Sequence, residues 1–213
     1  MSTKIIMIRH GYSISNNLKF FTGQSDVELT DLGREQARLC GEYFKGYVGV
    51  DAIYSSDLSR AYDTALEVGH ALSLDVIKDK ALREIYAGEW EMMPFVEIEK
   101  KYPDEYSVWK NDIGKAVPVG GERVADMAKR IENEVREIAK RHDGSSVIIV
   151  THATPIRVIC ALADGLDIAD MVKMPWVSNA SISVFKFDGN FRLLEKNITS
   201  HLGELKTDLP RGV

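Results

Sequence analysis

In the stretch IIMIRHGYS, residues 5–13, four apolar residues are followed directly by a cation, an imidazole and a glycine, namely Arg9, His10 and Gly11. A run of four apolar residues without alternation is typical of a strand that is buried on both faces of a sheet. Arg9 and His10 are unusual residues at the end of such a strand. The stretch therefore predicts a core strand over 3–9 and a candidate site at its carboxyl end.

A second segment of the chain has the same organisation. In SSVIIVTHA, residues 145–153, an aliphatic strand again runs into a histidine and then a small residue. Ligands of open α/β sheets bind outside the carboxyl ends of the strands, so His10 and His152 are expected at one edge of the sheet. A single histidine at such a place is more often structural, whereas two at equivalent strand ends favour a site.

The remaining segments alternate between strand-like and helix-like patterns. Further strands are predicted over 48–56 and 74–79, and helices over 30–46, 57–74, 123–142 and 154–165. Residues 180–188 and 191–198 predict a terminal hairpin, and 200–213 predict a tail. This alternation predicts an α/β fold, a three-layer α/β/α sandwich with a mostly parallel central sheet. One domain is expected over 1–213, with approximately 85–122 as a small helical cap insertion.

Composition and charge narrow the function classes. The formal net charge of −5 argues against a nucleic-acid partner, because such proteins usually carry a basic face. No run of 18 apolar residues indicates a membrane span, and the N-terminus lacks a signal-peptide pattern, so a cytoplasmic protein is expected. The two cysteines show no metal-ligand spacing. No cofactor is predicted, and the sequence leaves the oligomeric state open, with a homodimer as one candidate.

Metal ligation is the first alternative for the two histidines, and their neighbours argue against it. No cysteine or carboxylate stands at ligand spacing, and Arg9 and Arg157 would repel a cation. The planar fork of arginine matches the oxygens of a phosphate group instead. Because Arg60 and Arg83 also lie near strand–helix junctions, the sequence predicts an anion pocket rather than a metal site.

Six blocks of this sequence together resemble the histidine phosphatase superfamily, which includes the cofactor-dependent phosphoglycerate mutases. They follow the family's order and spacing over nearly the whole chain. An Arg-His-Gly tripeptide alone would be weak evidence for the family. The blocks are RHGxSxxN (9–16), FTGQSDVELTDLGREQA (21–37), SSDLSRAYDTA (55–65), LREIYAGEWE (82–91), PVGGE (118–122) and VTHATPIR (150–157).

The resemblance implies roles for five catalytic residues. His10 would be the nucleophile that takes the phosphoryl group, which splits one difficult displacement into two easier ones. Arg9, Arg60 and His152 would neutralise the oxygens of the transferring group. Glu84 would protonate the leaving oxygen and later accept a proton from water. Without the resemblance, Glu84 would be interpreted as a surface glutamate paired with its neighbour, the arginine at position 83.

The resemblance also implies a set of substrate contacts. These are expected from Asn16, from a loop formed by Thr22, Gly23 and Gln24 that contributes backbone amides, and from Ala153. In addition, Gly11 would leave room for the approaching phosphate.

Four positions depart from the family pattern. Tyr12 stands where glutamine or glutamate is common, Met92 where glycine is usual, and Arg123 where serine is common. Ala153 replaces a frequent glycine, a change that is tolerated unless the backbone φ is positive. None of the four removes a catalytic group, but Tyr12, Met92 and Arg123 leave the substrate specificity open.

The block that begins at Glu84, the candidate acid, distinguishes phosphatases from mutases within the family. Residues 84–91, EIYAGEWE, match the Glu-x-x-x-Gly-x-Trp-Glu pattern of the phosphatases, whereas the glycolytic mutases carry an Arg-His-Tyr-Gly run and a longer cap. The resemblance therefore implies a histidine acid-type phosphatase acting on a small-molecule phosphate monoester. A cofactor-dependent phosphoglycerate mutase is one alternative, and an inactive phospholigand-binding or scaffold protein is another.

Overall fold

The structure is a computed structural model, and it describes residues 1–207. The fold is built around a six-stranded sheet. The strand order is β4-β3-β6-β1-β7-β8, and the first four strands are parallel while β7 and β8 form an antiparallel hairpin beside β1. The predicted mostly parallel sheet is confirmed. The strands are β1 (Thr3–Arg9), β3 (Val50–Ser55), β4 (Val76–Lys78), β6 (Ser146–Thr151), β7 (Ile182–Phe187) and β8 (Phe191–Ile198).

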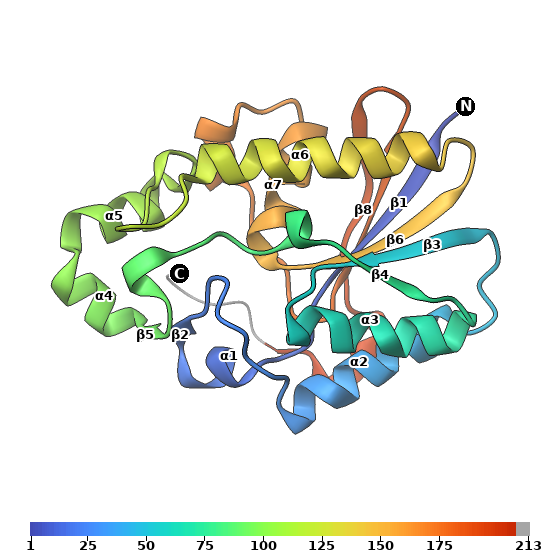
Figure 1. The fold of residues 1–213 in the computed structure, drawn as a ribbon, viewed down its shortest axis with the longest axis horizontal. Helices are drawn as coiled ribbons and strands as arrows, with labels where there is room; N and C mark the ends of the chain where they lie inside the picture. The colour runs from blue at the N-terminus through green and yellow to red at the C-terminus, as the bar shows by residue number, and fades with distance from the viewer. Residues whose placement is uncertain (208–213) are drawn as a thin grey trace.

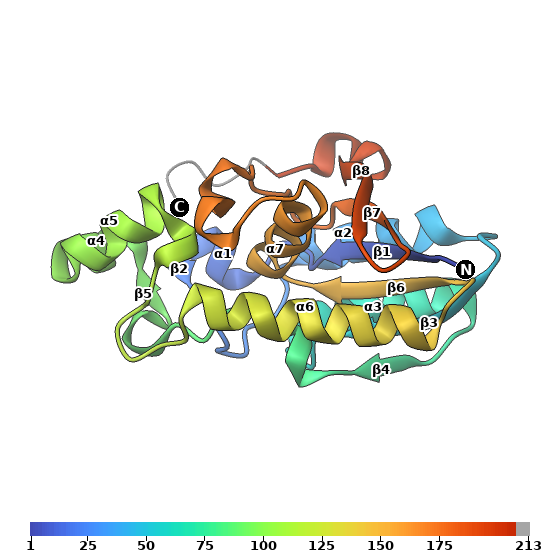
Figure 2. The same cartoon turned by 90° about the horizontal axis from the view of Figure 1, so that it is seen from above.

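Helices cover both faces of this sheet and complete the three predicted layers (Figures 1 and 2). The helices α2 (Asp31–Phe44) and α3 (Ser59–Leu72) lie on one face, and α6 (Val124–Arg141) and α7 (Ala153–Ala163) lie on the other. Successive residues of a strand point to opposite faces. In β1, Ile5 and Met7 therefore pack with α6 and α7, whereas Ile6 and Ile8 pack with α2 and α3.

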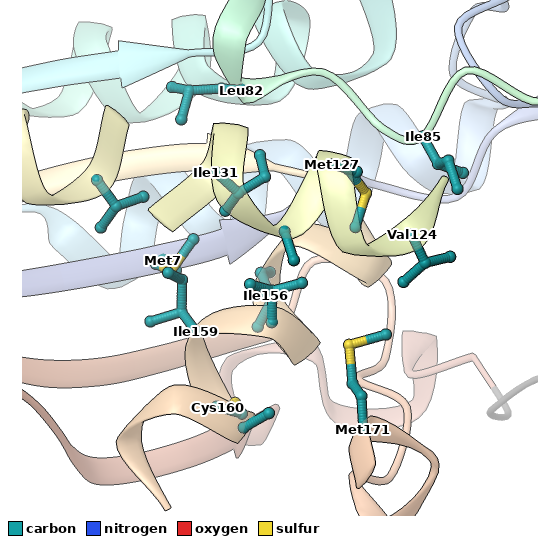
Figure 3. Close-up of a cluster of buried hydrophobic side chains, with 14 of the residues drawn as sticks. Met7, Leu82, Ile85, Val124, Met127, Ile131, Ile156, Ile159, Cys160 and Met171 are labelled. Carbon is teal, nitrogen blue, oxygen red and sulfur yellow. The ribbon is translucent and has the colours of Figure 1, made fainter. Parts of the chain in front are cut away.

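The helix α6 shows how local periodicity builds the core. Its apolar residues recur every three or four positions, and the residues of this stripe are fully buried: Val124, Met127, Ile131, Val135 and Ile138. Several of them meet α7 across the core in Figure 3. Within residues 1–207, no helix combines the length and the apolar character needed to cross a bilayer.

The segment 85–122 lies beyond the carboxyl ends of the parallel strands (Figure 1). It contains β5 (Met93–Pro94), α4 (Phe95–Lys101) and α5 (Pro103–Asn111), together with the 3₁₀ turns η2 (Gly88–Trp90) and η3 (Ile113–Lys115). The sequence did not predict α1 (Ile14–Leu18) or β2 (Phe20–Phe21), which pairs with β5. Elements of two to five residues are too short to show a hydrophobic period. The division into one domain with a cap stays a prediction.

The predicted tail is partly wrong. Residues 200–205 form the 3₁₀ turn η5 (Ser200–Leu205), which packs against α2 through the buried Leu202. Gln36 of α2 donates its amide to the carbonyl of Leu205 at 2.8 Å. The remaining described turns are η1 (Lys80–Leu82) and η4 (Ile168–Lys173). The rest of the predicted tail, 208–213, lies outside the described residues.

Candidate active site

The two histidines predicted at one sheet edge lie side by side in the structure. β1 and β6 are neighbours in register, with Arg9 opposite Thr151, so the residue after each strand emerges at the same edge. The ring centroids of His10 and His152 are 5.2 Å apart, with an edge-on interplanar angle of 61°. Both residues line a cavity of about 990 Å³.

The hydrogen bonds of His10 identify its tautomer. Its Nδ1 lies 2.7 Å from the carbonyl oxygen of Gly11, and because a carbonyl can only accept, Nδ1 carries the proton. Burial lowers the pKa of His10 well below its ordinary value of 6.5, and Arg60 and Arg9 lower it further. His10 is therefore neutral near pH 7, with an unprotonated Nε2.

Two arginines place a buried positive charge beside this imidazole. Arg60 is 1% exposed, and its two terminal nitrogens donate hydrogen bonds to the carbonyls of Ser25 and Gly23 at 2.9 and 2.8 Å. Arg9 donates to the carbonyl of Val177 at 2.6 Å. Burial lowers the pKa of each arginine to about 10, while the charge of Glu84 partly offsets that effect. Both guanidinium groups remain charged near pH 7.

The second histidine is oriented by a residue that sequence reasoning missed. The Nε2 of His152 lies 2.8 Å from Ser56 Oγ, and its buried Nδ1 has no hydrogen-bond partner within residues 1–207. If the Ser56 hydroxyl donates to Nε2, the Nδ1 of His152 carries the proton and can donate to an anion. Ser56 stands inside the SSDLSRA block, and position alone did not single it out.

The buried histidines make the stability of this chain pH-dependent. Burial is the main cause that lowers the pKa of both His10 and His152, so the unfolded chain binds more protons than the folded chain below pH 6.5. We expect the free energy of unfolding to fall by about 1.4 kcal/mol per pH unit for each histidine as the pH drops from 6.5 toward the folded pKa values. Urea unfolding at pH 7.5, 6.5 and 5.5 measures this slope.

Matched variants test the origin of that slope. Replacing both histidines by asparagine (His10→Asn with His152→Asn) should flatten it, leaving the smaller contribution of His201, whose pKa is also lowered mainly by burial. An unchanged slope in the double variant would show that other groups cause the pH dependence.

Glu84 is held at the cavity by main-chain amides. Its Oε1 accepts from the N–H of Ile85 at 2.8 Å, and its Oε2 accepts from the N–H of Thr154 at 3.2 Å, in the first turn of α7. The alternative of a surface pair with Arg83 is wrong. Arg83 instead makes a bidentate ion pair with Asp57, at 2.6 and 2.7 Å.

Arg130 supports the main chain on both sides of the candidate acid. It donates to the carbonyls of Ala81 and Arg83, at 2.7 and 3.0 Å, and to that of Glu84 at 3.3 Å, while pairing with Glu122. Its sequence pattern is that of an ordinary cation on the polar face of α6. Only the fold reveals its contact with the segment of Glu84.

Glu91 fastens the loop that carries Thr22, Gly23 and Gln24. Its Oε1 accepts from the N–H of Gln24 at 2.8 Å and from the N–H of Ala87 at 3.2 Å, and its Oε2 accepts from Ser25 Oγ at 2.7 Å. The main-chain amide of Gln24 therefore faces Glu91 instead of the cavity. Thr22 and Gly23 line the cavity, whereas Gln24 does not. Because the carbonyls of this loop bind Arg60, Glu91 also positions that guanidinium.

Asn179 joins the first strand end to Asn16. Its Nδ2 lies 3.2 and 3.3 Å from the carbonyls of His10 and Gly11, and 3.0 Å from Asn16 Oδ1. Asn16 Oδ1 also accepts from the N–H of Ser13, so a ligand in the cavity would meet the amide nitrogen of Asn16. No local pattern marks Asn179, which approaches the site from the segment before β7.

Gly11 has a different purpose from the one expected. A Cβ atom at this position would lie 2.4 Å from the carbonyl oxygen of Gly33, in the first turn of α2. Glycine is therefore needed for close packing of the strand end against α2, and Gly11 does not border the cavity. The expectation that it admits the phosphate is wrong.

The four departures from the family pattern fall into two groups. Tyr12 and Ala153 line the cavity, and Ala153 has no positive φ, so its methyl group adds no backbone strain. Met92 has φ +58°, a conformation that favours glycine, and it lies outside the cavity lining. Arg123 is an exposed residue at the start of α6. Only Tyr12, of the three substitutions that left specificity open, borders the cavity.

Nine of the ten site residues expected from the sequence line one cavity. They are Arg9, His10, Asn16, Thr22, Gly23, Arg60, Glu84, His152 and Ala153. A neutral imidazole, two buried guanidinium groups and a carboxylate at one sheet edge can bind an anion and transfer a group to a nitrogen.

Comparison with known proteins agrees with this chemistry. The sequence model of the histidine phosphatase superfamily (branch 1) matches residues 5–199. The chain is 34% identical over 212 residues to phosphoserine phosphatase 1 of Hydrogenobacter thermophilus, covering 99% of both proteins. A solved mycobacterial glucosyl-3-phosphoglycerate phosphatase is similar at TM-score 0.85 and 29% identity, over 93% of this chain and all of that chain. A Bacillus stearothermophilus protein, YhfR, is similar at TM-score 0.88 and 29% identity, over 94% and 99%.

Proposed function

The chain belongs to the histidine phosphatase superfamily, and from this premise we propose that it hydrolyses a small phosphorylated metabolite through a phosphohistidine formed on His10. It is a phosphoric monoester hydrolase, in agreement with the names of its relatives. One observation carries the mechanism: a neutral imidazole whose Nδ1 donates to the carbonyl of Gly11, so that its Nε2 is free to attack.

The first step transfers the phosphoryl group to the protein. The Nε2 lone pair of His10 attacks phosphorus while the bond between phosphorus and the ester oxygen breaks. Glu84, in its protonated form, gives a proton to that oxygen, so the alcohol leaves rather than the much more basic alkoxide. The products of this step are phosphohistidine, a free alcohol and the Glu84 carboxylate.

The second step returns the protein to its starting state. A water molecule attacks phosphorus, the bond between phosphorus and Nε2 breaks, and the Glu84 carboxylate takes the proton of the water. Inorganic phosphate leaves, and Glu84 is again protonated. In both steps Arg9, Arg60 and the Nδ1 of His152 stabilise the charge on the phosphoryl oxygens, in a buried pocket where such interactions are strong.

The substrate class is proposed from the relatives and the cavity. The relatives are named for phosphoserine and glucosyl-3-phosphoglycerate, which are both small phosphate monoesters. We expect the substrate of this chain among the phosphorylated metabolites of the cytoplasm.

A substrate panel tests this function. After exhaustive chelation, the protein should release inorganic phosphate from several small monoesters, among them O-phosphoserine, glucosyl-3-phosphoglycerate and 3-phosphoglycerate. In a parallel assay, conversion of 3-phosphoglycerate to 2-phosphoglycerate, with and without the bisphosphate, should be slower than phosphate release. Faster conversion would identify a mutase. Binding of these esters without release or conversion would identify a phospholigand-binding protein.

A further inference from the structure

The cavity is much larger than a phosphate group requires. At about 990 Å³ it has the size of sites that bury a drug-sized ligand, which are roughly 300–1,000 Å³. The histidines and buried arginines occupy the end at the sheet. The lining also includes elements that lie beyond the strand ends, namely β2, the segment from β5 into α4, α5 and the segment before β7 (Figure 1). This outer part faces whatever is esterified to the phosphate.

Aromatic side chains dominate this outer part. We call five of them the aromatic wall: Phe20, Phe21, Phe95, Trp109 and Trp176. The ring of Phe21 packs edge-on against Phe95 and Trp109, with centroids 5.9 and 4.9 Å away. Phe21 and Trp109 are only 5% and 2% exposed, so they support this side of the wall from the core, whereas the half-buried Phe20, Phe95 and Trp176 offer more ring surface to a ligand.

Trp176 is held in place by a buried cation. The guanidinium of Arg157 lies 4.0 Å from the centroid of the indole ring, in stacking range. Arg157 is 2% exposed, and it donates to the carbonyls of Met174 and Met171, at 3.0 and 3.2 Å, just before Trp176 in the chain. One cation thus contacts both the indole ring and the chain segment that leads to it.

Few charges are available in the outer part to recognise a polar alcohol group. The charged residues there are Lys19 and Glu99. Glu99 is exposed and forms an ion pair with Lys110, which offsets its charge. Lys19 is exposed at the cavity and forms no ion pair within residues 1–207. A zwitterionic alcohol such as serine would therefore find one cation and no unpaired carboxylate beside the aromatic wall.

We propose that the aromatic wall binds a flat apolar group on the alcohol side of the substrate, so that this chain prefers phosphomonoesters whose alcohol carries an aryl ring. The proposal rests on the proposed function, because it requires the phosphate to occupy the end of the cavity at His10. Burial of a phenyl ring against the wall removes apolar surface from water, and that burial supplies the preference.

Two substrates with equally basic leaving groups test the proposal. Ethyl phosphate and 2-phenylethyl phosphate are both esters of primary alcohols of similar basicity, and both need the proton from Glu84, so a difference in kcat/KM reports the ring rather than the chemistry of the leaving group. We expect kcat/KM to be roughly ten- to a hundredfold higher for 2-phenylethyl phosphate. O-phosphoserine should lie nearer to ethyl phosphate.

Substitutions in the aromatic wall should change the ratio of these two kcat/KM values. Trp176→Ala is expected to reduce the ratio at least fivefold, and Trp176→Phe should retain part of it because a ring remains. Phe95→Ala, on α4, is a second variant if Trp176→Ala fails to fold, as judged by circular dichroism. Val172→Ala is the matched control, because Val172 is an exposed residue of η4 outside the cavity lining. Its ratio should equal that of the wild type.

The outcomes separate this inference from the proposed function. Equal kcat/KM for both substrates, with hydrolysis that depends on His10, would overturn the inference and leave the proposed function intact. An unchanged ratio in both Trp176→Ala and Phe95→Ala would also overturn it. Failure to hydrolyse either substrate, or hydrolysis that survives His10→Ala, would instead overturn the proposed function.

Discussion

His10→Ala is expected to lower kcat/KM for every phosphomonoester by roughly 10⁴-fold or more, as loss of a covalent nucleophile does in other enzymes. The buried His10 carries the Nε2 that would attack phosphorus, and alanine leaves no atom there that can bond to the phosphoryl group. Quenching the wild type with a ³²P-labelled substrate should trap a protein-bound phosphate that is stable in alkali and labile in acid. The variant should trap none.

His70→Ala is the matched control for this experiment. His70 is an exposed histidine in the last turn of α3, far from the cavity lining, and its loss should leave both turnover and labelling unchanged. Turnover by His10→Ala within tenfold of the wild type would contradict the covalent mechanism. An acid-stable label, as on a hydroxyl group, would contradict it as well.

Glu84→Gln is expected to separate substrates by the basicity of their leaving groups. The amide keeps the size of the side chain but cannot give a proton to the ester oxygen. For an alkyl ester such as ethyl phosphate, kcat/KM should fall roughly 10²- to 10⁴-fold. Phosphoryl transfer from p-nitrophenyl phosphate should change much less, because nitrophenolate leaves without a proton. Stopped-flow detection of nitrophenolate measures this step directly.

The second half of the reaction gives an additional readout for Glu84→Gln. Since the carboxylate is also the proposed base for the attacking water, phosphohistidine should accumulate in the variant after a burst of nitrophenolate. Glu89→Gln is the control, because Glu89 is an exposed carboxylate that pairs with Lys101, outside the cavity. An equal loss for both substrates, without accumulation of phosphohistidine, would contradict the acid–base role of Glu84.

Local patterns in the sequence were enough to predict the fold class and the meeting of two distant histidines. The aliphatic runs before Arg9 and Thr151 are long enough to identify core strands, and parallel strands bring their carboxyl ends to one edge. The family resemblance then implied the positions of Arg60 and Glu84, and both line the same cavity. The strand predictions depend on patterns that are complete within ten residues, and the resemblance depends on the order of six short blocks, so neither requires knowledge of contacts between distant residues.

Other features of the site depend on contacts between segments that carry no such pattern. Asn179 reaches the carbonyl of His10 across 169 positions of the chain, and Ser56 reaches His152 across 96. Glu91 stood in the 84–91 block without an assigned role, and Arg130 looked like an ordinary charged residue, until the fold placed them against the loop of Gln24 and the segment of Glu84. The reason for Gly11 was likewise a contact, with the backbone of Gly33.

By itself, then, the sequence determined an α/β sheet with a histidine at the end of each of two strands, because strand burial and helix amphipathicity are local consequences of residue order. Only the tertiary structure decided which nitrogen of His10 is unprotonated and which groups hold Arg60 and Glu84 in place. It also decided that Tyr12 faces the cavity whereas Met92 and Arg123 do not. The physical reason is that tautomers, cavity walls and carboxylate partners are set by atoms within a few ångströms, and here most of those atoms belong to residues far apart in the chain.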